Sequence, residues 1–346
     1  MRRLRPANPA IGLAIAAIAA VAGAEPPAGS TPAESAPEPP PPAPIAAESP
    51  SLLRRDLPES RPTPGSVGDL TAARREPLRA ALASIGRREV AVESAGVVLF
   101  DPRCVEGADP AVRRLAAATA VRFSTMLAAM RRTLGGFAAT DPPSPTRVIV
   151  LHPTRDAFEL AEATLFSQAP LASRLATTQE LALDDAAVPL IDAWHDPDEA
   201  TFRAAVGRAL AMSLLREQFE LSGERSLPAW IREGLASQLV AMHASPPSLE
   251  PVLRRNGLAF IRGGGDLAAL LSKPPEDPAW IDLNGPAQAV AFLAVQRLAE
   301  GNPQGLDRFL AAVRSGMSVK VAFERAFGTS ADAFIAHLAT YYRVND

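Results

Sequence analysis

The chain has 346 residues, of which 47% are hydrophobic, and a formal net charge of −3. This length has room for about two average domains, and the hydrophobic fraction excludes a protein that is disordered throughout. The lack of a basic excess excludes a surface that neutralises a nucleic-acid backbone, so we expect no nucleic-acid partner. The single cysteine, Cys104, excludes an internal disulfide and a cysteine-based zinc knuckle.

Residues 1–24 are typical of an export signal. Three arginines lie within the first five residues, an apolar run covers residues 11–22, and residues 22–24 are small. The apolar run is shorter than the roughly 20 residues that span a bilayer. We therefore predict a cleaved signal peptide, a periplasmic or secreted protein, and no stable membrane span. An uncleaved N-terminal anchor is the alternative.

Residues 25–67 form a predicted disordered linker. Thirteen of the 34 prolines fall between Glu25 and Gly65, and this composition favours extended polyproline conformers without a packed core. The remaining chain is divided by prediction into residues 68–246 and a helical C-terminal subdomain over residues 247–346.

The folded part begins with alternating helix and strand patterns. In chain order the expected elements are a helix over 69–85, strands over 89–93 and 97–100, a helix over 110–134, a strand over 146–151, a helix over 154–167 and a strand over 181–191.

Two buried amphipathic helices follow, one opening at Asp196 and Pro197 and the other near Ser226. Glycines 263–265 indicate a turn into a helix capped by Asp266. Three more helices are expected over residues 287–299, 303–315 and 330–342. The sequence thus predicts an α+β fold with a small mixed sheet, a helix pair and a mainly helical C-terminal part.

Residues 227–236 read LPAWIREGLA, which resembles the signature of the peptidase MA-like family, secreted bacterial zincins of the gluzincin type. A more diffuse likeness runs in order from about residue 89 to 342. The resemblance implies a zincin-like metallopeptidase fold, in which Glu233 occupies the position of the third zinc ligand. It also implies an upstream helix carrying a His-Glu-x-x-His motif.

The upstream helix departs from that motif at each essential position. The resemblance places Arg208 at the first histidine, Ala209 at the catalytic glutamate and Met212 at the second histidine. Arginine keeps its proton, a thioether is a poor zinc ligand, and alanine offers no base for an attacking water. We therefore expect no bound zinc, no other cofactor and no catalytic residue.

Two of the aligned side chains have alternative roles. If the helices face each other as the resemblance implies, Arg208 and Glu233 form a bidentate ion pair in place of the metal; otherwise Arg208 extends to solvent. Trp230 either shapes the cleft with these two residues or packs in the core between the two helices.

The remaining residues with side chains suited to catalysis or metal binding form no recognisable site. No histidine among His152, His195, His243 and His337 has ligand spacing to another, which favours surface or capping roles. A nucleophile elbow and a phosphate-binding loop are missing from the sequence, and no histidine lies near Cys104 in sequence.

The sequence therefore predicts an exported pseudopeptidase that binds a peptide or protein in the former catalytic cleft, along a sheet edge near residues 181–191. One alternative is an active hydrolase or metallopeptidase that uses an unrecognised site. The other is a structural protein of the cell envelope.

Overall fold

The computed structural model describes residues 79–80, 82–84, 86–134, 146–166, 176–183, 186–196, 198–219, 226–244, 249–275 and 277–344. These residues belong to one compact unit. The predicted leader and linker lie outside the described residues, as does most of the helix expected over 69–85, whose described residues 79–80 and 82–84 are helical. Within the described ranges, no helix combines the length and apolarity needed to cross a bilayer.

Five strands form one mixed sheet in the order β1-β2-β3-β5-β4. The strands are β1 (Val92–Ser94), β2 (Val97–Phe100), β3 (Arg147–His152), β4 (Ala176–Leu183) and β5 (Ala186–Trp194). The central strands β2, β3 and β5 run parallel, whereas β1 and β4 pair antiparallel at the two edges.

The single strand expected over residues 181–191 is wrong. The segment belongs to two strands, β4 and β5, which pair with Leu183 opposite Ala186. Two aspartates at positions 184 and 185 separate the strands in the sequence, and strands disfavour aspartate. The continuous alternation of polar and apolar residues concealed that break.

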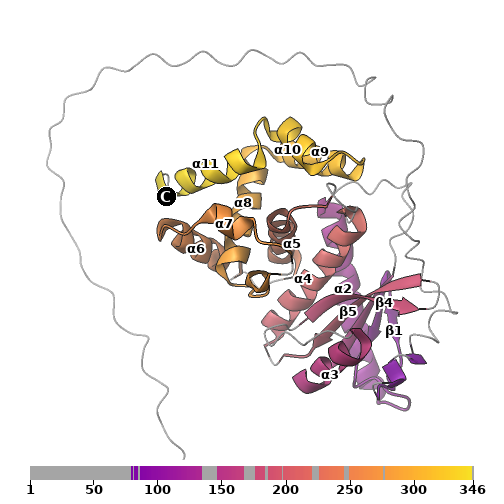
Figure 1. Ribbon diagram of the computed structural model, residues 1–346. Helices are drawn as coiled ribbons and strands as arrows, with labels where there is room; N and C mark the ends of the chain where they lie inside the picture. Colours follow the sequence, from indigo (N-terminus) through magenta and orange to yellow (C-terminus); the bar gives the residue numbers. More distant parts are fainter. Residues whose placement is uncertain are drawn as a thin grey trace, which may run out of the picture. The chain divides into compact units, whose positions relative to one another are not determined.

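Helices cover both faces of the sheet (Figure 1). Helices α2 (Pro110–Leu134) and α4 (Glu199–Phe219) pack on one face and α3 (Arg155–Phe166) packs on the other, while α5 (Ala229–His243) packs on α4 and α2. Because side chains alternate along a strand, Leu99, Ile149 and Ile191 join the core formed with α2 and α4. The opposite face carries His152, and the centre of its ring lies 5.9 Å from the centre of the Phe158 ring of α3. The expected helices over 110–134 and 154–167 are confirmed.

The C-terminal part is helical: α6 (Leu249–Arg262), α7 (Leu267–Leu271), a short 3-10 turn (Pro278–Trp280), α8 (Pro286–Gly301), α9 (Pro303–Arg314), α10 (Val319–Phe327) and α11 (Ala331–Val344). Helix α8 packs against α5, α6 and α9, and one hydrophobic cluster extends from Val97 to Tyr342. The α+β class with a small mixed sheet and a helical C-terminal part is confirmed, as is the Asp266 cap. Helices α6 and α10 were not predicted.

Candidate functional site

Helices α4 and α5 pack side by side and bring Arg208 and Glu233 together. Nη2 of Arg208 donates to Oε2 of Glu233 at 2.5 Å. This confirms the predicted ion pair and excludes the alternative in which Arg208 only extends to solvent. The contact joins one nitrogen to one oxygen, so the bidentate geometry that we expected is wrong.

Two residues of the C-terminal part complete the network. The amide of Gln288 on α8 donates to Oε2 of Glu233 at 2.8 Å and to the Trp280 carbonyl at 2.7 Å. Its oxygen accepts from the Ser237 hydroxyl at 2.9 Å, and Arg208 also donates to the Trp280 carbonyl at 3.0 Å. We call these five residues the Arg208 network. Gln288 was missed in the sequence, where its only signal is a glutamine within an apolar helix.

The network is largely sealed from solvent. Glu233 is 2% exposed and Gln288 is fully buried, while the Arg208 side chain keeps 19% exposure. Gly234 permits this closure, because a side chain there would clash with the Ala291 carbonyl of α8. A guanidinium and an amide of the chain itself therefore occupy the space around the carboxylate.

The other aligned residues have packing roles. Ala209 is buried, and its carbonyl accepts a hydrogen bond from the Thr178 hydroxyl of β4 at 2.8 Å. Met212 is half-buried against the core. Trp230 is buried and stacks on Phe334 at 6.1 Å, with its edge near Phe323. The packing role of Trp230 is thus confirmed, although its aromatic neighbours come from α10 and α11.

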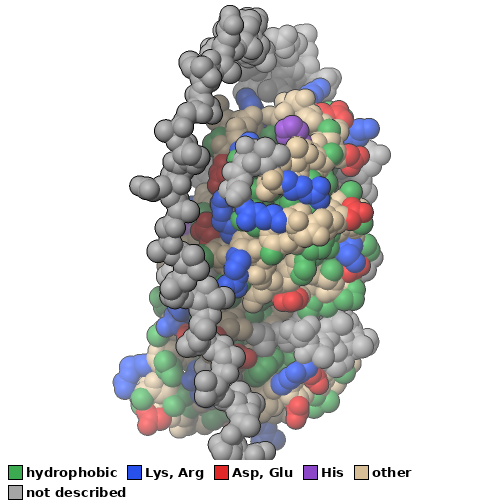
Figure 2. Space-filling view, turned by 90° about the vertical axis from the view of Figure 1, so that its left-hand side faces the viewer, with side chains coloured by type: hydrophobic (Ala, Val, Ile, Leu, Met, Phe, Trp, Pro, Cys, Tyr) green, Lys and Arg blue, Asp and Glu red, His purple; other side chains and the backbone are tan. Residues whose placement is uncertain are grey.

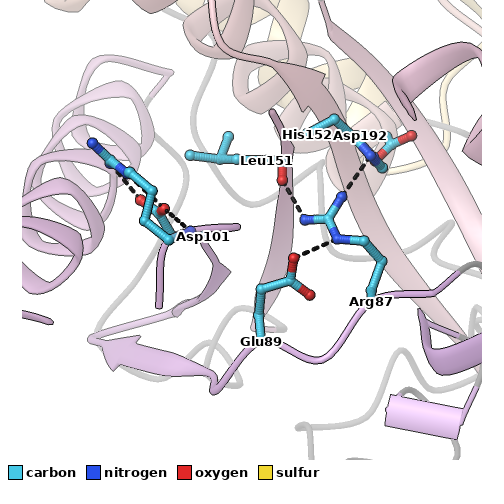
Figure 3. Close-up of polar contacts among 7 residues, drawn as sticks. Arg87, Glu89, Asp101, Leu151, His152 and Asp192 are labelled. Carbon is cyan, nitrogen blue, oxygen red and sulfur yellow. Dashed lines mark hydrogen bonds and ion pairs between the residues drawn. The ribbon is translucent and has the colours of Figure 1, made fainter. Parts of the chain in front are cut away.

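A second polar cluster lies on the α3 side of the sheet (Figure 3). Arg87 donates through Nε to Glu89 at 2.5 Å, through Nη1 to Nδ1 of His152 at 2.6 Å and through Nη2 to the Leu151 carbonyl. Nε2 of His152 lies 2.5 Å from Oδ1 of Asp192. Because Nδ1 accepts from Arg87, the neutral ring carries its proton on Nε2 and donates it to Asp192. We call Arg87, Glu89, His152 and Asp192 the Arg87 cluster.

The surface or capping role expected for His152 is therefore wrong. The residue ends β3 and is fully buried, because strand alternation directs it beneath α3. Burial and, to a smaller extent, the charge of Arg87 lower the pKa of His152 to about 3. Burial also raises the pKa of Asp192 well above its ordinary value, against the effect of Arg87. A buried neutral imidazole with both nitrogens engaged is not positioned to take a proton from a substrate.

The other three histidines remain apart from these groups. His195 is exposed beside Phe202 and His337 is exposed on α11, as expected. His243 is half-buried and bonds the Thr133 hydroxyl at 2.7 Å. Cys104 is buried. Among the described residues, no group of three or more His, Cys, Asp or Glu side chains is arranged to hold a metal ion.

Comparison with known proteins gave no match: no protein-family model matches the chain, and no curated protein matches it.

Proposed function

We propose that the protein is a zincin-like relative of the peptidase MA-like family that has lost hydrolysis and binds an extended peptide or protein segment. The observation that supports this proposal is the Arg208–Glu233 ion pair. A fixed positive charge lies beside the carboxylate at the point where the aligned motif would place a metal ion.

The residues around Glu233 do not fit zinc. Two ligands at i and i+4 lie one turn apart on the same helical face, which is the spacing that grips a tetrahedral ion. Arg208 and Met212 hold these two positions on α4, and neither supplies a suitable lone pair. Ala209 offers no general base. We derive no catalytic step at this site.

The edge of β4 is the surface that we assign to the peptide. Among the described residues, strand β4 ends the sheet and pairs only with β5, so within that part of the chain its other edge presents unpaired backbone groups. The Thr178 hydroxyl fixes this strand to α4 at Ala209, next to Arg208. An extended peptide adds to such an edge through backbone hydrogen bonds. This position suits binding better than the buried interior around Glu233.

Metal analysis of the purified full-length chain tests the loss of hydrolysis. We expect no zinc above background in the wild type, and about one zinc per chain in the triple variant Arg208→His, Ala209→Glu, Met212→His. A matched double variant, Arg208→His with Met212→His, should bind zinc without gaining hydrolysis. Stoichiometric zinc together with casein cleavage in the wild type would overturn the proposal. A folded triple variant without zinc would refute the alignment.

Fluorescence anisotropy with labelled casein, a disordered protein, tests the binding edge. Proline variants at the adjacent positions 179 and 180 form a matched pair, because successive residues of a strand point their backbone N–H groups toward β5 and away from it in turn. We expect the variant at the outward position to keep the wild-type melting temperature and to lose casein binding. Unchanged binding in that variant, or no casein binding by the wild type, would contradict the proposed edge.

A further inference from the structure

Five arginines lie on three packed helices of the C-terminal part. They are Arg254, Arg255 and Arg262 on α6, Arg297 on α8 and Arg343 on α11, and we call them the arginine patch. Arg255, Arg262 and Arg343 are exposed, and the other two are half-buried. Figure 2 shows Lys and Arg side chains gathered across the middle of one face. The concentration is notable in a chain whose net charge is −3.

Specific contacts bring the patch together. Arg255 and Arg262 lie seven residues apart, which places them on the same face of α6. Nε of Arg343 donates to the Ile261 carbonyl at 3.3 Å, so the end of α11 meets the end of α6 beside Arg262. The Arg297 guanidinium lies 3.9 Å from the centre of the Tyr341 ring. The exposed carboxylate of Glu300 and the guanidinium groups of Arg254 and Arg297 all act on the neighbouring Tyr342, whose pKa burial raises to about 12.

Most of this positive charge is not neutralised within the fold. Among the described residues, no carboxylate forms an ion pair with Arg255, Arg262, Arg297 or Arg343. Stacking on Tyr341 also fixes the orientation of the Arg297 guanidinium, which reduces the entropy that it loses on binding an anion.

The chemistry of the patch favours a carboxylate-rich protein over a lipid surface. The exposed large hydrophobic side chains among the described residues all lie outside α6, α8 and α11. The patch therefore lacks the apolar side chains with which peripheral proteins enter the acyl boundary of a membrane. Guanidinium groups, in contrast, match carboxylates with two parallel hydrogen bonds.

We infer that the arginine patch binds an acidic segment of a partner protein. This surface is distinct from the β4 edge and does not depend on the proposed function. Binding is electrostatic and therefore weakens as salt rises. A variant that loses peptide binding at β4 should still bind the acidic segment at the arginine patch.

Fluorescence anisotropy of the full-length chain with a labelled poly-glutamate peptide tests this inference. We expect binding at low salt, no binding of a poly-glutamine peptide, and affinity about tenfold weaker in Arg255→Glu with Arg262→Glu. The matched control, Arg113→Glu with Arg114→Glu, makes the same charge change at two exposed positions of α2 and should bind as the wild type does.

Melting temperatures distinguish lost binding from lost folding, and the single variant Arg255→Gln gives a milder test at an exposed position in the middle of α6. We expect weaker binding in that variant at an unchanged melting temperature. The inference is overturned if the wild type does not bind poly-glutamate or if the two double variants bind equally. It is also overturned if the wild type prefers phosphatidylglycerol vesicles to the peptide.

Discussion

The Arg208 network and the Arg87 cluster both set a guanidinium against a buried carboxylate, yet they satisfy their polar atoms differently. In the Arg208 network one oxygen of Glu233 accepts from both Arg208 and Gln288. The atoms that stay buried without a hydrogen-bond partner differ as well: Nε of Arg208, a donor, in the network, and Oε2 of Glu89, an acceptor, in the Arg87 cluster. A buried acceptor without a donor costs stability.

The difference separates two uses of arginine. Arg208 joins helices α4 and α5 to the C-terminal part and keeps a partly exposed side chain. Arg87, whose side chain is 9% exposed, ties the segment before β1 to the end of β3. The first occupies a position where the resemblance predicts a metal ligand, whereas the second has a structural role that no sequence motif indicated.

Removing Arg208 should give the largest effect. We expect Arg208→Ala to lower the free energy of unfolding by about 3 to 5 kcal/mol, because Glu233 then keeps a buried charge with no cation beside it. The matched control is Arg203→Ala on the same helix, which removes an exposed pair with Glu199 and should cost under about 1 kcal/mol. Urea denaturation measures both. Equal losses would show that the ion pair of the Arg208 network contributes no more than a surface contact.

Removing Arg87 should have a somewhat smaller effect. We expect Arg87→Ala to cost about 2 to 3 kcal/mol, because the Glu89 carboxylate and Nδ1 of His152 both lose their donor. Arg122→Ala, which breaks a pair with both side chains 51% exposed, is the control. Hydrogen exchange should locate the loss at residues 86–94. If the amide protection falls evenly across the whole sheet, the Arg87 cluster does not stabilise this segment locally.

The pH dependence of the Arg87 cluster should give the smallest effect, because two contributions oppose each other. The folded pKa of His152 lies below its ordinary value of 6.5, so its contribution to stability is present above 6.5 and is lost as pH falls toward about 3. The folded pKa of Asp192 is raised, so its contribution is present below 3.8 and is lost as pH rises through the folded value.

Single variants separate these contributions. Between about pH 4 and 6.5 the wild-type slope should stay below the limit of about 1.4 kcal/mol per pH unit for one proton. Asp192→Asn should make the protein lose stability more steeply on acidification, and His152→Gln should reverse the sign of the slope. Denaturant titrations at several pH values measure these slopes. Identical slopes in the three proteins would exclude a contribution from this pair.

Local patterns in the sequence were sufficient for most of the helices, whereas the pairing of Arg208 with Glu233 was one of two alternatives that the resemblance offered. Both residues lie on helices that are buried over most of their surface, and the motif around Glu233 indicated which turns face each other. The identity of the fold as zincin-like stays a prediction, as do the exported location and the bound peptide.

Long-range contacts account for most of what the sequence did not reveal. Gln288 lies 55 residues from Glu233, and His152 lies 40 residues from Asp192. The meeting of His152 and Asp192 depends on the parallel register of β3 and β5, in which Asp192 lies opposite Val150. No spacing in the sequence fixes that register. The local sequence around His152 therefore does not distinguish a buried histidine from an exposed one.

The central position of α8 has a consequence for how the protein unfolds. Gln288 of this helix binds Glu233, Ala291 lies against Gly234, and the Leu293 carbonyl accepts the Tyr342 hydroxyl at 3.4 Å. Helices before and after residue 246 therefore use the same helix as their packing partner. We therefore expect the two halves to melt in one cooperative transition, and we expect a chain cut between them to leave each piece with an uncovered apolar surface that promotes aggregation.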